Sequence, residues 1–566
     1  MHETLEFVQN IMDSYKSFNS LLEDTIKKNW DKDALTDYKG ATLQYHDVAR
    51  KIEKLHILFE HSGIKEGDKI ALCGRNSYMW AAAFLATLTY GAVAVPIQHE
   101  FTPEQVYNIV NHSEARLLFV GDVVNTQLDP ERMPALEGIV YIPDYSLVIS
   151  RSEELTYARE NLNALYGKKY PKFFHQEHVS YFKDEPDDIC MINYTSGTTG
   201  FSKGVILSYR VMSSNMEWAF QCVKPHVKEG SNVLSMLPMA HMYGLTCEFL
   251  TSFVLGNHLF FLTRLPSPSF IAEACADIKP AFVVAVPMVI EKIIRKKIFP
   301  KIQSYPMHLL LNMPVVSKKV KERICQDVKN VFGGNLYQVL VGGAGLNAEI
   351  EQFLTNIGFP ITMGYGTTET GPMITYSDYH DFEGGSCGTP VVNMEVKILS
   401  PDPENVPGEI ITRGDNVMNG YFKNPEASRA VLDDEGWFHT GDLATMSADG
   451  HVFIRGRIKN MLLGANGQNV YPEEIENKLN SMTMVSESII LQKGDKLIGL
   501  IYPDMDTASS LGLNDNDITE IMEQNRQELN KTLPAFCKIS KFKIHHEEFA
   551  KTPKKSIKRY LYQDAV

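Results

Sequence analysis

The 566-residue sequence has no Cys-x-x-Cys pair. Its eight cysteines are scattered along the chain, so we expect neither a disulfide framework nor a zinc site built on paired cysteines. Unpaired thiols suit a reducing compartment, and this predicts a cytoplasmic protein. The cysteines are Cys73, Cys190, Cys222, Cys247, Cys275, Cys325, Cys387 and Cys537.

The sequence also lacks an apolar run that would predict a membrane span. Met79 to Ile97 carries no charge, but Gly91 and Pro96 interrupt it. A buried helix over Trp80–Leu88 followed by a buried strand over Ala92–Ile97 fits this stretch better than a spanning helix of about 20 apolar residues. The N-terminus lacks the basic and then apolar pattern of a signal peptide. We expect no transmembrane segment.

An excess of positive charge is absent as well, because the formal net charge is −14 at pH 7. Nucleic acids bind to basic protein surfaces through their phosphates, so no nucleic-acid partner is expected. The net charge also offers no electrostatic help for binding an anionic membrane. Peripheral membrane contact and assembly into a homo-oligomer both stay open. The hydrophobic content of 44% and charged content of 22% are those of an ordinary globular protein.

What the sequence does contain is a loop rich in hydroxyls and glycines, Tyr194-Thr-Ser-Gly-Thr-Thr-Gly-Phe-Ser-Lys-Gly204. Apolar residues lead into it and out of it, which predicts strand, tight loop and strand. Glycines let backbone N–H groups approach a ligand, hydroxyls donate to phosphate oxygens, and the lysine adds positive charge. The loop therefore predicts polyphosphate binding, with contacts from Thr195, Ser196, Gly197, Thr198, Thr199, Gly200 and Lys203.

Two other interpretations of this loop fit the residues less well. A Walker A loop has Gly-Lys-Ser/Thr at the start of a helix, whereas here Lys203 follows Ser202 and β-branched residues come next. A flexible Ser/Thr/Gly linker is the second alternative. Linkers are seldom flanked tightly by strands, so we favour the phosphate loop.

Later motifs supply the rest of a nucleotide site. Gly342-Gly-Ala-Gly345 could lie against a flat base, with Tyr365 on the other side of it. Glu369 is a candidate ligand for a hard cation, Asp442 can accept hydrogen bonds from ribose hydroxyls, and Arg457 can donate to ribose or phosphate. Singly, these residues are also explained as a glycine turn, a core tyrosine, a solvated carboxylate and a surface ion pair. Their joint occurrence with the phosphate loop favours a nucleotide site.

Strand and helix patterns alternate through the chain, which predicts an α/β fold with largely parallel sheets. Short strands and turns over residues 387–456 predict a small β-barrel-like subdomain. A boundary is expected near Lys459, because Tyr471-Pro-Glu-Glu then begins a helix with proline and acids in its first turn. We therefore predict a large domain over residues 1–458 and a small, mobile α/β domain over residues 459–566.

At these motifs the sequence resembles the adenylate-forming superfamily of acyl-CoA synthetases, luciferases and peptide-synthetase adenylation domains. The resemblance covers roughly residues 30 to 560, and the hinge region looks most like fatty acyl-CoA ligases. It rests on Tyr194–Gly204 as phosphate loop, Leu237-Pro-Met-Ala-His241 as acyl gate, Gly342–Gly345 and Tyr365-Gly-Thr-Thr-Glu369 as adenine and magnesium elements, Gly436–Asp442 and Gly456–Asn460 as ribose and hinge motifs, and Gly464–Glu476 as the element of the thioester-forming conformation.

The resemblance implies a two-step reaction. A carboxylate attacks the α-phosphate of Mg-ATP to give acyl-adenylate and pyrophosphate, and the thiol of CoA then displaces AMP. It implies catalytic roles for Lys203, Glu369 and a C-terminal lysine, with Glu369 holding Mg²⁺. Rotation of the C-terminal domain about Lys459 and Asn460 would switch between the steps. Beside the phosphate loop, the implied nucleotide contacts are Gly343, Ala344, Gly345, Tyr365, Gly366, Thr368, Asp442 and Arg457.

Two residues bear on the acyl substrate that the resemblance implies. His241 is either a core or helix-end histidine or the residue that gates the acyl carboxylate, and we favour the gate. At Gly366 the acetate-specific members of the superfamily have a bulky aromatic residue. Glycine there leaves the floor of the pocket open and favours a medium- or long-chain fatty acid. The apolar run Gly244–Leu262 either lines this pocket or is plain core.

One motif departs from the superfamily. Its C-terminal motif ends in Gly-Lys-Ile/Val-x-Arg, and aligning Ile557 and Arg559 with this pattern places Ser556 at the lysine position. Lys555 is the nearest substitute, and a merely basic, solvated tail is the alternative. A smaller departure is Gly345, where many relatives have proline.

We therefore predict a cytoplasmic, ATP-dependent fatty acyl-CoA synthetase that uses Mg²⁺ and takes CoA as co-substrate. Its partners would be small molecules, namely the fatty acid, ATP and CoA. Two alternatives stay open: a ligase that delivers the acyl group to a separate acyl carrier protein or stops at the adenylate, and a catalytically weak protein that binds acyl groups or nucleotides.

Overall fold

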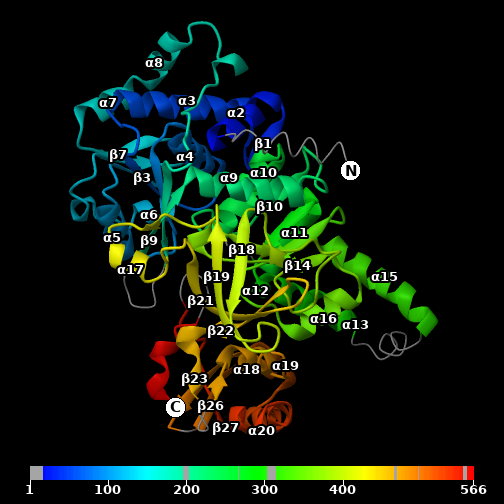
Figure 1. Cartoon of the computed structure of the whole chain (residues 1–566). Helices are drawn as coiled ribbons and strands as arrows, with labels where there is room; N and C mark the ends of the chain where they lie inside the picture. Colours follow the sequence, from blue (N-terminus) through cyan, green and yellow to red (C-terminus); the bar gives the residue numbers. More distant parts are fainter. Residues whose placement is uncertain are drawn as a thin grey trace.

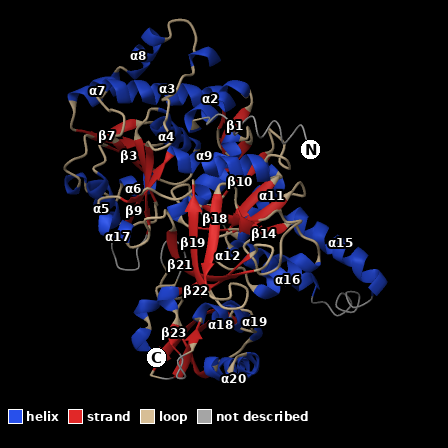
Figure 2. Cartoon of the chain, in the orientation of Figure 1, coloured by secondary structure: helices blue, strands red, loops and turns tan. Residues whose placement is uncertain are grey.

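A computed structural model describes residues 17–195, 203–264, 267–302, 314–463, 468–494, 496–551 and 557–565. Within them, two large sheets with helices around them form the upper two-thirds of the molecule, and a smaller sheet with its own helices lies at the bottom (Figures 1 and 2). The α/β fold class predicted from the sequence is therefore confirmed. Among these residues, no helix combines the length and apolar character that crossing a membrane requires.

The first large sheet has eight strands in the order β20-β9-β8-β4-β3-β5-β6-β7. Its five central strands run parallel, from β8 to β6, and the edges are antiparallel. The predicted strands that flank the phosphate loop are β8 and β9, which pair directly. The strands are β3 (Lys69–Cys73), β4 (Val93–Ile97), β5 (Leu117–Val120), β6 (Gly138–Tyr141), β7 (Ser146–Ser150), β8 (Ile189–Thr195), β9 (Lys203–Ser208) and β20 (Gly420–Tyr421).

The second large sheet has seven strands in the order β14-β13-β12-β10-β11-β1-β2, and all neighbours are parallel except β1 and β2. Parallel strands end at a common edge, so the segments that follow β10, β12 and β13 come together there. The strands are β1 (Asp33–Asp37), β2 (Thr42–Gln44), β10 (Asn232–Ser235), β11 (His258–Phe261), β12 (Phe282–Ala285), β13 (Gln338–Val341) and β14 (Ile361–Met363).

Helices cover the large sheets, and local sequence explains several of their ends. In α5, Thr102 and Gln105 form a capping box and Pro103 begins the helix. The α-helices of this part are α2 (Phe18–Lys28), α3 (Tyr45–His61), α4 (Tyr78–Thr89), α5 (Pro103–Ser113), α6 (Asp122–Asn125), α7 (Glu153–Glu160), α8 (Leu162–Lys169), α9 (Tyr209–Trp218), α10 (Thr251–Val254), α11 (Pro268–Ile278), α12 (Pro287–Ile293), α13 (Phe299–Ile302), α15 (Pro314–Val331), α16 (Ala348–Asn356) and α17 (Pro425–Arg429).

Several short helical segments complete this part. The π-helical turns are η3 (Ala219–Val223), η4 (Tyr243–Leu250) and η5 (Ile294–Ile298), and the 3₁₀ turns are η1 (Pro130–Arg132), η2 (Gln176–His178), η6 (Thr368–Thr370) and η7 (Ile458–Asn460). The longest of the π-helical turns, η4, lies beside the cleft described below.

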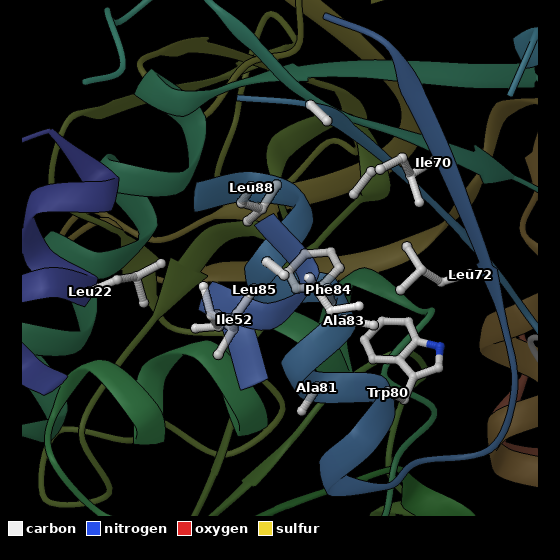
Figure 3. Close-up of a cluster of buried hydrophobic side chains, with 14 of the residues drawn as sticks. Leu22, Ile52, Ile70, Leu72, Trp80, Ala81, Ala83, Phe84, Leu85 and Leu88 are labelled. Atoms are coloured by element: carbon white, nitrogen blue, oxygen red, sulfur yellow. The ribbon is translucent and has the colours of Figure 1, made fainter. Parts of the chain in front are cut away.

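Helix α4 lies at the centre of the largest hydrophobic cluster (Figure 3). Trp80 stacks on Phe84 with ring centroids 5.4 Å apart, and both side chains are almost fully buried. The uncharged stretch Met79–Ile97 is therefore a core helix followed by strand β4, as the sequence predicts. Its apolar character reflects burial between sheet and helices.

The β-rich region over residues 387–456 differs from the prediction. It is an open antiparallel sheet in the order β18-β19-β21-β22, whose edge strands β18 and β22 do not pair with each other, so no barrel closes. A three-stranded sheet, β15-β16-β17, precedes it. The strands are β15 (Tyr365–Gly366), β16 (Met373–Tyr376), β17 (Thr389–Pro390), β18 (Met394–Leu399), β19 (Gly408–Gly414), β21 (Phe438–Met446) and β22 (Val452–Arg457).

The C-terminal part has a core of its own, formed within residues 462–562. Helix α18 begins at Pro472 with Glu473 and Glu474 in its first turn, as predicted. The elements are β23 (Leu462–Leu463), β24 (Asn469–Val470), α18 (Pro472–Leu479), β25 (Val485–Lys493), β26 (Lys496–Pro503), α19 (Met505–Leu511), α20 (Asp515–Thr532), η8 (Ala535–Cys537), β27 (Ile539–Ile544), η9 (Arg559–Leu561) and η10 (Gln563–Ala565).

Candidate functional site

A large cleft of about 2160 Å³ brings together most of the residues that the sequence singles out. Its wall comes from both large sheets, the β-rich region and the C-terminal part. Of the predicted site residues, those that line the cleft are Thr195, Lys203, His241, Gly343, Ala344, Gly345, Tyr365, Gly366, Thr368, Glu369, Asp442, Arg457 and Lys459.

Some predicted residues fall elsewhere. Ser196, Gly197, Thr198, Thr199 and Gly200 of the phosphate loop lie outside the described residues, although both ends of the loop, Thr195 and Lys203, line the cleft. Lys555 and Ser556 also lie outside the described residues. Asn460 is not part of the cleft wall, and its amide donates a 2.6 Å hydrogen bond to Glu473 Oε1.

Lys203 and Glu369 meet at a third side chain, Tyr421. The ammonium of Lys203 lies 4.6 Å from the centroid of the Tyr421 ring, and the Tyr421 hydroxyl donates to Glu369 Oε1 at 2.9 Å. Strand β20 carries Tyr421 and pairs with β9, placing Tyr421 opposite Val205, two residues beyond Lys203. Burial is the main factor that raises the pKa of Tyr421, and the Glu369 carboxylate adds to it, so the hydroxyl stays protonated as a donor.

Tyr365, Asp442 and Arg457 form a second polar group. The Tyr365 hydroxyl donates to Asp442 Oδ2 at 2.7 Å, and Arg457 Nε donates to Asp442 Oδ1 at 2.9 Å. Asp442 and Arg457 are register partners on strands β21 and β22. Burial raises the pKa of Asp442, and the Arg457 cation opposes that shift. Both carboxylate oxygens keep a lone pair for a ligand's hydroxyl donors.

The glycine-rich turn Gly342–Gly345 follows strand β13 at the edge of the sheet. Gly343 has φ of +84°, a backbone conformation that glycine adopts without strain. A Cβ at Gly342 would lie 2.9 Å from Cζ of Tyr243, whose hydroxyl donates to the carbonyl of Leu340 at 3.0 Å. Glycine at 342 is therefore required by packing against Tyr243, and Gly343, Ala344 and Gly345 line the cleft, where the flat-base interpretation places them.

The segment Leu237–His241 lines the cleft and leads into η4. The backbone N–H of Tyr243 donates to Nδ1 of His241 at 3.2 Å, which orients the His241 ring beside the start of η4. The run Gly244–Leu262 is mostly core: residues of η4 are buried, whereas Leu262 reaches the cleft wall.

Glu248, one of the buried residues of η4, was not singled out from the sequence. Its carboxylate accepts hydrogen bonds from Ser235 Oγ at 3.0 Å and from the backbone N–H groups of Met236 and Leu237 at 3.2 and 3.1 Å. Burial raises its pKa to about 8, although these donors oppose the shift. Glu248 thus fixes the segment that precedes His241.

Gly366 lines the cleft, but its lack of a side chain has a local cause. A Cβ at this position would lie 1.9 Å from the carbonyl oxygen of Pro372, because β15 and β16 shift register between Tyr365 and Gly366. Any larger residue in this backbone would collide with the neighbouring strand. Glycine at 366 is therefore required by packing, and it does not by itself report the size of the acyl substrate.

The C-terminal part reaches the cleft through two sets of contacts. Asn347 Nδ2 donates to Ser481 Oγ at 2.9 Å and to the carbonyl of Asn480 at 3.3 Å. Lys551 also lines the cleft, held by Glu487 at 2.6 Å and Glu548 at 2.5 Å. Lys459 lies at the junction of the two parts and lines the cleft as well.

The residues present suit a magnesium ion accompanied by phosphates. Mg²⁺ in such sites takes one or two carboxylates and fills its remaining positions with water and phosphate oxygens. Glu369 offers a carboxylate in the cleft wall with one oxygen hydrogen-bonded to Tyr421, which leaves coordination capacity. The carboxylate of Glu369 therefore fits the ion that the sequence implies.

Tyr421 and Glu248 are the residues that the sequence did not reveal. Tyr421 belongs to a two-residue strand far along the chain, and only its pairing with β9 brings it to Lys203. The Gly420-Tyr421 step before Pro425 resembles an ordinary turn. Glu248 stands in an apolar run, where a single buried acid is itself an unusual feature.

Comparisons with known proteins agree with this geometry. Residues 22–422 match the family model described as AMP-binding enzyme, and residues 459–565 match the model described as AMP-binding enzyme C-terminal domain. The long chain acyl-CoA synthetase 6, peroxisomal, of Arabidopsis thaliana is 28% identical over 534 residues, which cover 87% of this chain and 73% of that protein. The 4-coumarate–CoA ligase CCL1 of Humulus lupulus is 26% identical over 541 residues, covering 92% and 88%.

Among solved structures, the anthranilate CoA ligase AuaEII in complex with anthranoyl-AMP superposes with a TM-score of 0.79 at 20% identity, over 97% of each chain. This similarity concerns the fold. The family-model match extends over more than half of the sequence and includes the cleft segments up to Tyr421. The chain therefore belongs to the AMP-binding enzyme family, the adenylate-forming superfamily.

Proposed function

We propose that the protein activates a medium- or long-chain fatty acid with ATP, forming an acyl-adenylate, and transfers the acyl group to CoA to give acyl-CoA, AMP and pyrophosphate. The observation that carries this proposal is the shared cleft, in which Lys203, Glu369, Tyr365 and Asp442 line the same space as an apolar wall. A space of about 2160 Å³ has room for more than one ordinary small-molecule ligand, which suits a reaction between substrates.

The nucleotide would lie between the glycine turn and the Tyr365 group. Gly343–Gly345 offers exposed backbone to the flat base, with Tyr365 opposite it. Asp442, already oriented by Tyr365 and Arg457, accepts hydrogen bonds from the ribose hydroxyls. Because both partners of Asp442 are protein groups, the carboxylate is held in place before the ligand arrives, which lowers the entropy lost on binding.

In the first step two anions must approach, a carboxylate and the α-phosphate. Lys203 and the donors at the ends of the phosphate loop stabilise the charge that moves onto pyrophosphate. Tyr421 orients this group by contacting both Lys203 and Glu369. Glu369 would hold Mg²⁺, and the ion would supply positive charge that neutralises the phosphates. Lys555 is the proposed further cation, from its place in the sequence motif.

An apolar wall beside His241 supports a fatty acyl chain. Its residues include Met242, Leu262, Val286, Met288 and Val289. Methionine and branched aliphatic side chains adapt to a flexible chain better than to one rigid ring. His241, which lines the cleft beside this wall, would contact the acyl carboxylate in the gate role that its motif implies. The 4-coumarate–CoA ligase among the similar proteins makes an aromatic acid the main competing substrate class.

The second step requires a path for the thiol of CoA. We propose that residues 459–566 move relative to residues 1–458 about Lys459 and Asn460, so that either Lys555 or the element Gly464–Glu476 faces the acyl-phosphate bond. Asn347 of the large part is hydrogen-bonded to Asn480 and Ser481 of the C-terminal part, and rotation would break these contacts. The independent core within residues 462–562 allows such rigid-body motion.

The test is a panel of carboxylic acids from acetate to oleate, with 4-coumarate and anthranilate added, scored for AMP formation with and without CoA. We expect the highest kcat/KM for acids of medium or long chain and AMP release coupled to CoA consumption. Preference for an aromatic acid would overturn the substrate class. Pyrophosphate release without CoA consumption would favour delivery to a carrier protein, and no release at all would leave a binding protein.

A further inference from the structure

The segment between β12 and β13 carries a concentration of positive charge that the whole-chain charge conceals. Residues 292–302 and 314–329 contain ten Lys and Arg but only two acidic residues, in a chain whose net charge is −14. The exposed cations define what we call the basic surface: Lys292, Arg295, Lys296, Lys297, Lys301, Lys318, Lys319 and Arg323.

The helices that carry the basic surface are anchored by their apolar sides. Ile294 and Ile298 of η5 are buried in the same hydrophobic cluster as Ile324 and Val328 of α15. Their cations therefore point away from that cluster and into solvent. Figure 1 shows α13 and α15 at the right-hand edge of the molecule, with α15 extending outward from the sheets. This arrangement presents the charge at a periphery, where a large partner can reach it.

Few carboxylates neutralise this surface. Among the described residues, Arg295 has an ion-pair partner, Glu349, at 3.6 Å. Lys297, Lys318 and Lys319 form no ion pair with any described residue. Excess charge of one sign that the protein does not compensate is available for a partner of the opposite sign.

The basic surface is continuous with the cleft. Lys292, Arg295, Lys296, Phe299 and Pro300 line the cleft wall, so the helix that leads out of the apolar wall also begins the basic surface. Phe299 and Ile302 pack against the same hydrophobic cluster and hold this segment in place beside the cleft. The lysines carry their ammonium groups on long aliphatic stems, which lets these groups reach lipid headgroups.

We propose that the basic surface docks the protein on an anionic lipid bilayer and places the cleft beside it. The choice of a bilayer rests in part on the proposed function, because fatty acids partition into membranes and would reach the apolar wall from there. Clusters of four to eight Lys and Arg bind anionic headgroups with roughly a fivefold gain in affinity for each cation near the surface. The negative net charge of the chain does not prevent this, because interactions between exposed charges more than about 8 Å apart are largely screened at physiological salt.

The experiment is sedimentation of the purified full-length protein with vesicles, without ATP, acid or CoA. One set contains equal parts of phosphatidylcholine and phosphatidylglycerol, and the other phosphatidylcholine alone. The test variant is K297Q/K318Q/K319Q, whose three lysines do not line the cleft. The matched control is K168Q/K172Q/K183Q, which makes the same charge change at exposed lysines elsewhere.

We expect binding to the anionic vesicles, loss of that binding at high salt, and about a hundredfold weaker binding for the test variant but not for the control. Melting temperatures and activity on a soluble short-chain acid should match wild type for both variants. Equal binding to the two vesicle types, no binding to either, or equal losses in both variants would overturn the proposal. So would tighter binding to a DNA duplex than to the anionic vesicles. Because no reaction is run, failure of the fatty-acid activity would leave the vesicle result interpretable.

Discussion

The hydroxyl of Tyr421 donates a 2.9 Å hydrogen bond to Oε1 of Glu369, and the same ring lies under the ammonium of Lys203. One side chain thus joins the proposed phosphate-binding lysine to the proposed magnesium ligand. Tyr421 is in turn fixed by β20, which pairs with the strand that begins at Lys203. The phosphate loop and the magnesium element are therefore coupled through a residue that belongs to neither motif.

Replacing Tyr421 tests this coupling. Y421F removes the hydrogen bond to Glu369 and keeps the ring beneath Lys203. We therefore expect about a tenfold loss in kcat/KM for ATP and a lower apparent affinity for Mg²⁺. Y421L also removes the cation–π contact and should lose a further factor of about three to five. Titrating ATP and Mg²⁺ separately checks both effects. If Y421F and wild type respond alike to Mg²⁺, the hydroxyl does not orient Glu369.

Asp442 provides a second test, of the ribose interpretation. D442N cannot accept hydrogen bonds on both sides, so Tyr365 or Arg457 loses a partner and a ribose hydroxyl loses its acceptor. We expect KM for ATP to rise roughly 10- to 100-fold with a smaller change in KM for the acid. D449N makes the same chemical change at an exposed carboxylate outside the cleft and should be neutral. A larger effect on the acid than on ATP would contradict the assignment.

The sequence predicts the parts of this site that are contiguous and misses those that depend on long-range pairing. Apolar residues on both sides of the hydroxyl-rich loop are enough to predict β8 and β9. Tyr421 is different, because only sheet pairing brings it to Lys203. The role of Gly366 was also beyond sequence reasoning, since the collision with Pro372 arises from a register shift. The prediction of a barrel was wrong, because a pattern of short strands and turns does not show whether the two edge strands pair with each other.

Gly366 leads to a prediction about stability. G366A places a Cβ against the carbonyl of Pro372, at a separation of 1.9 Å before relaxation. The backbone must move, and we expect a loss of about 1–3 kcal/mol or more in the free energy of unfolding. Thermal melting of G366A and of G167A, where a Cβ meets open space, measures this. A stable G366A with a shifted chain-length preference would restore the acyl-pocket interpretation of this glycine.

The role of Lys555 is inferred from the sequence motif alone, because Lys555 lies outside the described residues. If Lys555 acts in the first step, K555A should slow acyl-adenylate formation by roughly 10²–10³-fold, as loss of one charge-stabilising donor does in other enzymes. K554A is the matched control and should be nearly neutral. Transfer to CoA from pre-formed acyl-adenylate should be unchanged in K555A. Full adenylation activity in K555A, together with faster acyl-adenylate formation in S556K, would contradict the assignment of Lys555. It would mean that position 556 is the lysine position of the motif.

Glu248 leads to a prediction about how the stability of the protein depends on pH. Its pKa rises from the ordinary 4.5 to about 8 in the folded protein, so the folded state holds a proton there that the unfolded state releases. Folding is therefore most favourable with respect to this group below about pH 4.5, and stability falls by about 1.4 kcal/mol per pH unit until about pH 8. Gln resembles the protonated acid, because it has an acceptor oxygen and an NH₂ donor group and does not ionise.

The difference in melting temperature between E248Q and wild type should therefore move in favour of E248Q as the pH rises from about 5 to 8, and level off above that. E248L, which lacks the partners for Met236 and Leu237, should be less stable than E248Q at every pH. Because Glu248 fixes the segment before His241, E248L should also raise KM for the acid more than KM for ATP, with E248Q close to wild type. A pH-independent difference between E248Q and wild type would mean that Glu248 is ionised in the folded protein throughout this range.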